Sequence, residues 1–344
     1  MTEFEMLFGG IMERNVLVDR LKGYACFLVL FGHVIRGIRT TGISIPQFFI
    51  WMELFIWSFH VALFLFLSGV VYSLNGEWHT QNTKYKFILH KFLNLGIPYI
   101  VFSSIYIAIN SLVGGVNTES SLADILLIWK TPVAQYWFLY ALFFLFCIWT
   151  ALSGILKNWQ ITLLTLIIGY GVPLLGGTLG CFEVVFYSSL AFGIGTFVHF
   201  DKLVKPGTWF KCLIVFLHLT AGVTLLYLNL MEAMLFKEFM LLLGIYASIL
   251  LISLLQNCRP IASFLGFMNR YSFQIYLLHT IFTAGVRIVM LRLDITQWWI
   301  HVPIGIVCGI VFSVLTAMIA KKVRFLDFFF FPTKAFRKER VVHK

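Results

Sequence analysis

The stretch DRLKGYACFLVLFGH, residues 19–33, combines charged residues, an apolar run and a histidine. It opens an apolar segment of about residues 16–38, which carries charge at its start and a histidine near its far end. At a rise of about 1.5 Å per residue, Lys22 and His33 lie roughly 16 Å apart along a helix. They cannot touch, but they can serve two ends of one long substrate. An ionisable residue inside a membrane helix marks a candidate functional site.

The composition indicates an integral membrane protein. Of the 344 residues, 60% are hydrophobic and only 12% are charged, whereas about a quarter of the residues in a soluble domain are charged. The net charge of +11 is therefore interpreted as cytoplasmic loops rather than as a nucleic-acid surface. The six cysteines form no C-x-x-C pair, so the sequence suggests neither a zinc site nor a disulfide framework.

A helix needs about 20 apolar residues to cross a bilayer core, and ten segments of this sequence meet that length. We therefore predict an all-α, polytopic membrane helical bundle of about ten transmembrane helices. The fifth segment is the shortest and ends in glycines, and the stretch 120–130 is too short to span and is expected at the interface. The ten segments are 16–38, 47–74, 92–113, 134–156, 160–176, 180–198, 212–230, 238–256, 271–291 and 299–320.

The distribution of basic residues predicts the orientation. With ten spans and a cytoplasmic N-terminus, all but six of the 26 Lys and Arg residues fall on the cytoplasmic side, as the positive-inside rule requires. Both termini are then cytoplasmic. We expect one domain over residues 1–344, with a membrane core at about 16–320, a basic tail at 321–344 and a place in the cell (inner or plasma) membrane. No internal repeat is visible.

The outer half of the first two spans collects the main candidates. His33 and Glu53 lie at similar depth on antiparallel neighbours, so the carboxylate is expected to pair with the imidazole and raise its basicity. Arg36 is one turn above His33, and Gly32 and Gly37 permit close approach of a helix or ligand. The alternatives stay open: the histidine can simply bond across helices, and Glu53 and Arg36 can be interface residues.

Further candidates lie deeper or on the cytoplasmic side. As a group with Lys22, the lysines Lys84, Lys86 and Lys91 are suited to a phosphate-bearing cytoplasmic ligand, although each alone fits the positive-inside rule equally well. Ser68, followed by glycine, is either functional or a packing residue.

Two aromatic stretches supply the remaining candidates. Trp137 begins the fourth span, where an interfacial aromatic belt explains it equally well. His279 shares a helical face with Tyr276 near mid-membrane in the ninth span. His218 and Glu183 are interpreted as structural residues.

In their order and spacing these segments resemble the integral-membrane acyltransferase family 3, which O-acylates bacterial surface polysaccharides and related glycans. The resemblance covers about residues 15–320 and departs from the family pattern at Lys22, where arginine is usual, and at Asn94, where a second arginine is often seen. The matching residues are Asp19, Lys22, Gly23, Gly32 and His33, the run FHVALFLFLSG (59–69), Lys91, Pro98 and Tyr99, the run WFLY (137–140) and the run YLLH (276–279).

The resemblance implies transfer of an acyl group, expected to be acetyl, from acyl-CoA to a hydroxyl of a surface polysaccharide or its lipid-linked precursor. It implies a base, or less readily an acyl carrier, at His33, with no metal and no bound cofactor. The donor enters from the cytoplasm and its pantetheine arm reaches toward His33. The expected roles are catalysis by His33 and Glu53, donor binding by Lys22, Lys91, Ser68 and His279, and acceptor binding by Arg36 and Trp137.

Two other functions remain open from the sequence. One is a glycan or lipid transporter or flippase whose buried histidines line a path; the lack of repeats and of helix pairs broken by Gly or Pro argues against it. The other is an acyltransferase with a small-molecule or protein acceptor. The absence of G-x-S-x-G, H-E-x-x-H and phosphate-loop motifs removes any motif support for serine hydrolase, metalloprotease and P-loop chemistry.

Overall fold

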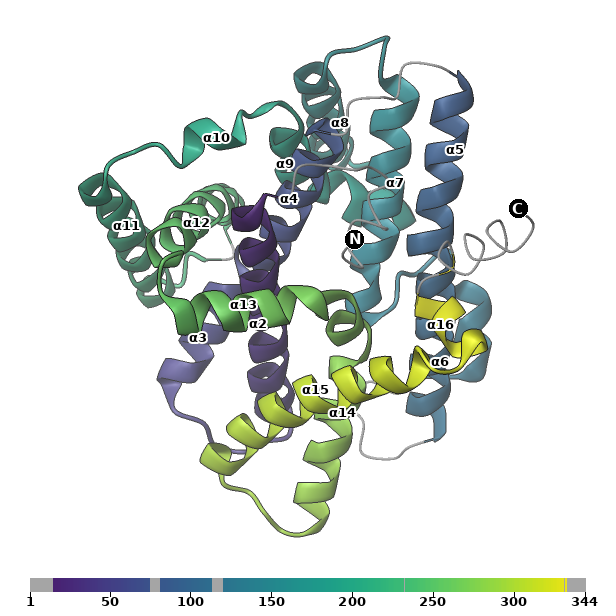
Figure 1. Ribbon diagram of the computed structural model, residues 1–344, viewed down its shortest axis with the longest axis vertical. Coiled ribbons are helices and arrows are strands. Elements are labelled where there is room, and N and C mark those ends of the chain that lie inside the picture. Colours follow the sequence, from purple (N-terminus) through teal and green to yellow (C-terminus); the bar gives the residue numbers. More distant parts are fainter. Residues whose placement is uncertain (1–14, 75–80, 113–119, 232, 331, 333–344) are drawn as a thin grey trace. The chain divides into compact units, whose positions relative to one another are not determined.

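The computed structural model describes residues 15–74, 81–112, 120–231, 233–330 and 332 (Figure 1). Every regular element within these ranges is a helix. This confirms the predicted all-α class, and it follows from the apolar composition, because a helix satisfies its backbone polar groups internally where no water can reach them.

Nine helical stretches of the described chain are long and apolar enough to cross a membrane, which confirms a polytopic bundle. The remaining predicted span is the fifth, which corresponds to α8 (Asn158–Leu174), a helix of 17 residues that contains Pro173. The nine stretches are Val16–Arg39, Gln47–Leu74, Thr83–Leu112, Ala134–Leu152, Gly180–Phe197, Thr208–Tyr227, Met234–Leu255, Ser272–Arg292 and Trp298–Ala320.

Helix α8 lies antiparallel to α9 (Glu183–Phe197) along its whole length. Near its start the Asn158 side chain donates to the Thr196 carbonyl at 3.0 Å, and near its end Gly169 approaches Phe186. The start of α8 thus meets the end of α9, and later residues of α8 meet earlier residues of α9, so the two helices form an antiparallel hairpin. Helix α8, with 17 residues, is therefore about as long as α9, with 15 residues, which belongs to a candidate membrane span.

The described chain divides into two compact units, which we name after one residue of each. Among the described residues, the His33 unit comprises those within 15–67 and 199–315, and the Lys91 unit comprises those within 68–198 and 316–332. The His33 unit contains α2 (Val16–Arg39), α3 (Gln47–Trp57), most of α15 (Trp298–Ala320), α10 (Phe200–Leu203), α11 (Thr208–Tyr227), α12 (Met234–Leu255), α13 (Arg259–Arg270) and α14 (Ser272–Arg292). The Lys91 unit contains α5 (Gln81–Lys91), η1 (Phe92–Gly96), α6 (Ile97–Leu112), η2 (Leu122–Leu127), η3 (Ala134–Tyr136), α7 (Trp137–Leu152), α8, η4 (Gly180–Phe182), α9 and α16 (Arg324–Phe330). The unit boundary falls within α4 (His60–Leu74).

Helix α2 is the central element of the His33 unit, and its bounds agree with the predicted span. Asn15 caps it by accepting hydrogen bonds from the backbone N–H groups of the first turn. Helix α13 crosses it at Gly23, where the backbone of Leu265 lies so close that no Cβ would fit (Figure 1). Glycine therefore permits a helix crossing closer than side chains allow.

The second span, predicted as continuous over 47–74, is interrupted between α3 and α4. The Ser58 hydroxyl donates to the Phe55 carbonyl at 2.7 Å, and the Phe59 N–H bonds only three residues back, to Ile56. His60 Nδ1 also bonds the Ile56 carbonyl at 2.7 Å. The interruption uses neither Gly nor Pro, and local side chains satisfy the backbone it frees.

The third span begins earlier than predicted, because α5, η1 and α6 form one helical stretch. The lysines Lys84 and Lys86 therefore lie on a helix rather than in a loop. Its middle, η1, is a π-helical turn in which the Ile97 N–H bonds the Phe92 carbonyl five residues back. Pro98 follows at once, and its missing N–H and ring clash explain the widened turn.

The predicted interfacial segment 120–130 forms the short 3₁₀ helix η2, closed by a capping box between Ser121 and Asp124. Its length confirms that it does not span, and Leu126 and Trp129 on it are exposed. The basic tail is described only through residue 330 and at residue 332, so most of that prediction lies outside the described residues.

Candidate active site

His33 lies in the C-terminal half of α2 with its ring half-buried. Its ring meets the edge of Trp57 at 5.1 Å between centroids and that of His279 at 5.0 Å. Within the described ranges no residue hydrogen-bonds either ring nitrogen. His33 therefore keeps both nitrogens available while aromatic neighbours hold the ring.

His279 reaches His33 from α14. It is fully buried, and its Nδ1 bonds the carbonyls of Ile275 at 2.7 Å and Tyr276 at 3.0 Å, which lie four and three residues back. Its Nε2 is buried with no hydrogen-bond partner among the described residues. The sequence identified His279 as a candidate, and the structure brings it to His33 rather than leaving it as a separate site.

Trp57, which sequence reasoning missed, links several of the candidates. Its ring packs on Gly32, where an added Cβ would come within 3.1 Å of it. The Arg36 guanidinium lies 3.6 Å above the ring, a cation–π contact, and the ring of His60 lies 5.0 Å away. The spacing of Trp57, four residues after Glu53 and three before His60, was the available signal, because such residues share a helical face.

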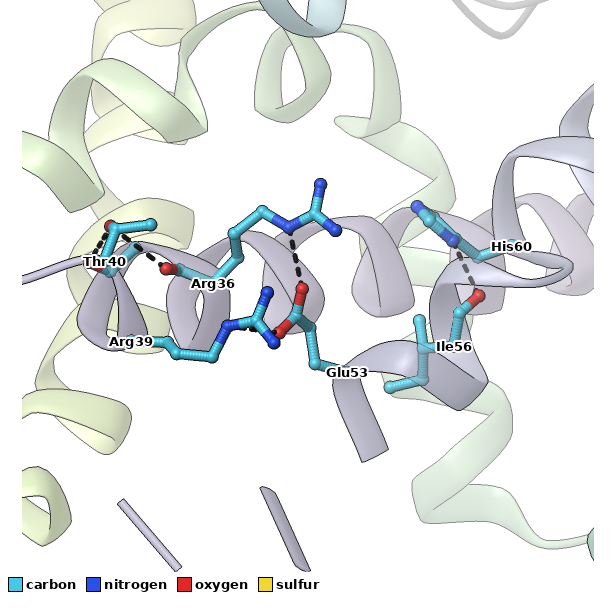
Figure 2. Close-up of polar contacts among 7 residues, drawn as sticks. Arg36, Arg39, Thr40, Glu53, Ile56 and His60 are labelled. Atoms are coloured by element: carbon cyan, nitrogen blue, oxygen red, sulfur yellow. Dashed lines mark hydrogen bonds and ion pairs between the residues drawn. The ribbon is translucent and has the colours of Figure 1, made fainter. Parts of the chain in front are cut away.

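The predicted pairing of Glu53 with His33 is wrong in this structure. The fully buried Glu53 carboxylate instead accepts from Arg36 Nε at 2.7 Å and faces Arg39 Nε at 3.3 Å. Figure 2 shows both arginines turning from α2 toward it. A buried carboxylate is stabilised more by two permanent cations than by a neutral imidazole. Glu53 is therefore linked to Trp57 through Arg36, and within the described ranges it makes no hydrogen bond or ion pair with His33.

The C-terminal end of α2 contacts one more cation that the sequence did not single out. The guanidinium of Arg287, a buried residue on α14, packs against Gly37, where a Cβ would overlap its Nη1. Both predicted close approaches, at Gly32 and at Gly37, are thus confirmed. The signal for Arg287 was an arginine inside an apolar span.

Lys22 lies in the N-terminal half of α2 and is almost fully buried. The α13 crossing at Gly23 adjoins it directly. Burying an ammonium group costs free energy unless it has compensating contacts. A lysine that only follows the positive-inside rule would lie exposed in a loop, so the burial of Lys22 favours a functional or structural role.

The other candidates belong to the Lys91 unit. Lys91 is buried, with its ammonium 4.9 Å from the Phe87 ring and 4.3 Å from the Phe146 ring. Ser68 is buried, and the adjacent Gly69 packs against the carbonyl of Phe192 on α9, which supports the packing interpretation of that pair. Trp137 is half-buried at the start of α7.

The site's groups suit acid–base chemistry on a polar substrate. It offers an accessible imidazole, a second imidazole behind it and a cation near the first. Across the part of the chain that the structure describes, no three His, Cys, Asp or Glu side chains gather as metal ligands.

Comparison with known proteins identifies the family. A family model described as an acyltransferase domain matches residues 15–318, which is nearly the whole chain. No curated protein and no solved structure matches. The match includes α2 with both Lys22 and His33, and it is the family to which the sequence motifs pointed. The chain is a multi-pass membrane protein and belongs to the acyltransferase 3 family.

Proposed function

We propose that the protein is an O-acyltransferase that moves an acyl group, expected to be acetyl, from acyl-CoA to a hydroxyl of a cell-surface polysaccharide or its lipid-linked precursor, in the cell membrane. The family supports acyl transfer in general. The observation that carries the specific proposal is the state of His33, whose ring is half-buried and makes no hydrogen bond within the described ranges. Such a nitrogen is free to accept a proton from a substrate hydroxyl.

The proposed reaction is one acyl transfer. The acceptor hydroxyl gives its proton to His33 as its oxygen attacks the thioester carbonyl. The bond from the carbonyl carbon to sulfur then breaks, the thiolate of CoA leaves, and His33 returns the proton to it. The products are the ester and free CoA, so no oxidant, reductant or metal is needed for the balance.

The two ends of α2 fit the two substrates of this reaction. Lys22 carries a positive charge on the cytoplasmic half, where the phosphates of CoA would be bound. His33 follows eleven residues later, roughly 16 Å along the axis at the usual helical rise. The pantetheine arm of the donor would span this distance between the phosphates at Lys22 and the thioester at His33. Arg36 is half-exposed and stacked on Trp57, which supports its proposed role in binding the acceptor.

The test compares surface glycans from cells that carry the wild-type protein, His33→Ala or the control His218→Ala. His218 is also a buried histidine packed on aromatic rings, but its ring neighbours are Phe55 and Phe59. Mass spectrometry should find the acyl increment with wild type and with His218→Ala, and none with His33→Ala at equal protein level in the membrane. Full acylation with His33→Ala would overturn the mechanism. Altered glycan export with no acyl increment in any sample would favour a transporter.

A further inference from the structure

We propose that His279 is the positioning residue of the base. In this proposal His279 accepts a hydrogen bond from one N–H of His33, and this bond stabilises the imidazolium that forms when the other nitrogen of His33 takes the acceptor's proton. The inference rests on the proposed role of His33. It replaces the expected donor-binding role of His279 with a role at the reaction centre.

The hydrogen bonds of His279 fix which nitrogen carries its proton. A carbonyl oxygen only accepts, so the Nδ1 that bonds the carbonyls of Ile275 and Tyr276 must be the protonated one. In the neutral ring Nε2 then carries a lone pair and can only accept. The backbone of α14 therefore holds His279 as an acceptor in one orientation.

That lone pair has no partner of its own. Nε2 of His279 is fully buried and makes no hydrogen bond to any described residue, and leaving a buried polar atom unsatisfied is unfavourable. A donor is therefore expected there during the catalytic cycle. The nearest ring is that of His33, in an edge-on arrangement with an interplanar angle of 62°.

The separation suits a hydrogen bond between the two rings. Two imidazoles joined by an N–H···N bond of about 3 Å have centroids roughly 5 Å apart, and the observed separation is 5.0 Å. A small rotation of His33 would direct an N–H at His279 Nε2. Its other nitrogen would then face the acceptor hydroxyl as a lone pair.

This chain of contacts follows the logic of a base held by a third group. When His33 takes the hydroxyl proton it becomes an imidazolium with two N–H groups. One N–H later gives its proton to the leaving thiolate, and the other stays bonded to His279 Nε2. His279 is not itself protonated in this scheme, and its own Nδ1–H remains on the Ile275 carbonyl.

Two substitutions at this position separate positioning from packing. His279→Phe keeps a ring of similar size but removes the acceptor. His279→Gln places an amide oxygen near the position of Nε2 and so restores an acceptor. His218→Phe is the matched control, because His218 is a buried histidine whose Nε2 also lacks a partner within the described ranges, yet its ring packs on phenylalanines.

The experiment measures steady-state transfer from acetyl-CoA by the purified full chain in lipid nanodiscs. His279→Phe should lower kcat roughly 100-fold, within the range of positioned acid–base groups, and leave the KM for acetyl-CoA unchanged. His279→Gln should recover about tenfold of that loss, and His218→Phe should match wild type. Combining His279→Phe with His33→Ala should add no further loss, because residues that act as a unit are not additive.

Each contrary result has a distinct meaning. A raised KM with unchanged kcat in His279→Phe would return His279 to donor binding and overturn the inference. Equal loss in His279→Phe and His279→Gln, or loss in His218→Phe as well, would reduce it to packing. If His33→Ala remains active, the proposed function itself fails, whereas an inactive His33→Ala beside a fully active His279→Phe overturns only the inference.

Discussion

On helix α2 the side chain of Lys22 is almost fully buried, whereas the side chain of His33, eleven residues further on, is only half-buried. Around Lys22 the packing is backbone against backbone, with α13 on Gly23. Around His33 the neighbours are rings, with Trp57 and His279 edge-on to the imidazole. One end is thus suited to holding a fixed charge, and the other to exchanging a proton with a substrate.

The largest change at the N-terminal end of α2 should come from Lys22→Ala. Losing a charge-assisted contact of about 1.5–3 kcal/mol should raise the KM for acyl-CoA roughly tenfold to hundredfold and leave kcat near wild type. Lys22→Arg keeps the charge and the residue usual in the family, and should stay close to wild type in donor kinetics. An unchanged KM in Lys22→Ala would remove this residue from the donor site.

A second change tests the helix crossing itself. Gly23→Ala would place a Cβ against the Leu265 backbone, which cannot move aside cheaply, so it should destabilise the protein by about 1–3 kcal/mol. Gly266→Ala on α13 is the control, because a Cβ there meets open space and alanine favours the helix. Thermal unfolding in detergent should separate the two variants. Equal stability would mean that α2 and α13 are not in close contact.

The smallest effect is expected near the C-terminal end of α2, from Glu53→Gln. The two arginines around Glu53 are partly exposed and water can solvate them, so the loss should stay within about 1 kcal/mol, a few-fold in kcat. Loosening of Arg36 above Trp57 is the expected cause. Arg39→Gln leaves the Arg36–Glu53 bond in place and should cost less. A loss in Glu53→Gln as large as in His33→Ala would instead indicate a direct catalytic role.

The sequence was sufficient for the fold and for the position of His33 because both depend on local pattern. Apolar runs long enough to span predict helices, and the bounds of α2 follow directly from one of them. Gly32 and Gly37 predicted close approaches for the same reason: they interrupt an apolar face with no side chain.

The partners of each group were harder to predict because they depend on competition and on distant contacts. Glu53 was assigned to His33, yet Arg36 and Arg39 lie three residues apart on one face and together attract the carboxylate more strongly. That competition was visible in the sequence. The meeting of His33 with His279 was not, because nothing local links α2 to α14. The interruption at Ser58 also had no Gly or Pro to announce it.

We propose that acyl-CoA binding and acyl transfer depend on opposite ends of α2, at Lys22 and at His33, and one paired measurement tests this division. Equilibrium binding of acyl-CoA and acyl transfer are measured on the same nanodisc samples of wild type, Lys22→Ala and His33→Ala. We expect His33→Ala to bind acyl-CoA as tightly as wild type and to transfer nothing, while Lys22→Ala binds weakly and still transfers at saturating donor. Undiminished transfer by His33→Ala, or loss of donor binding in that variant, would contradict the account.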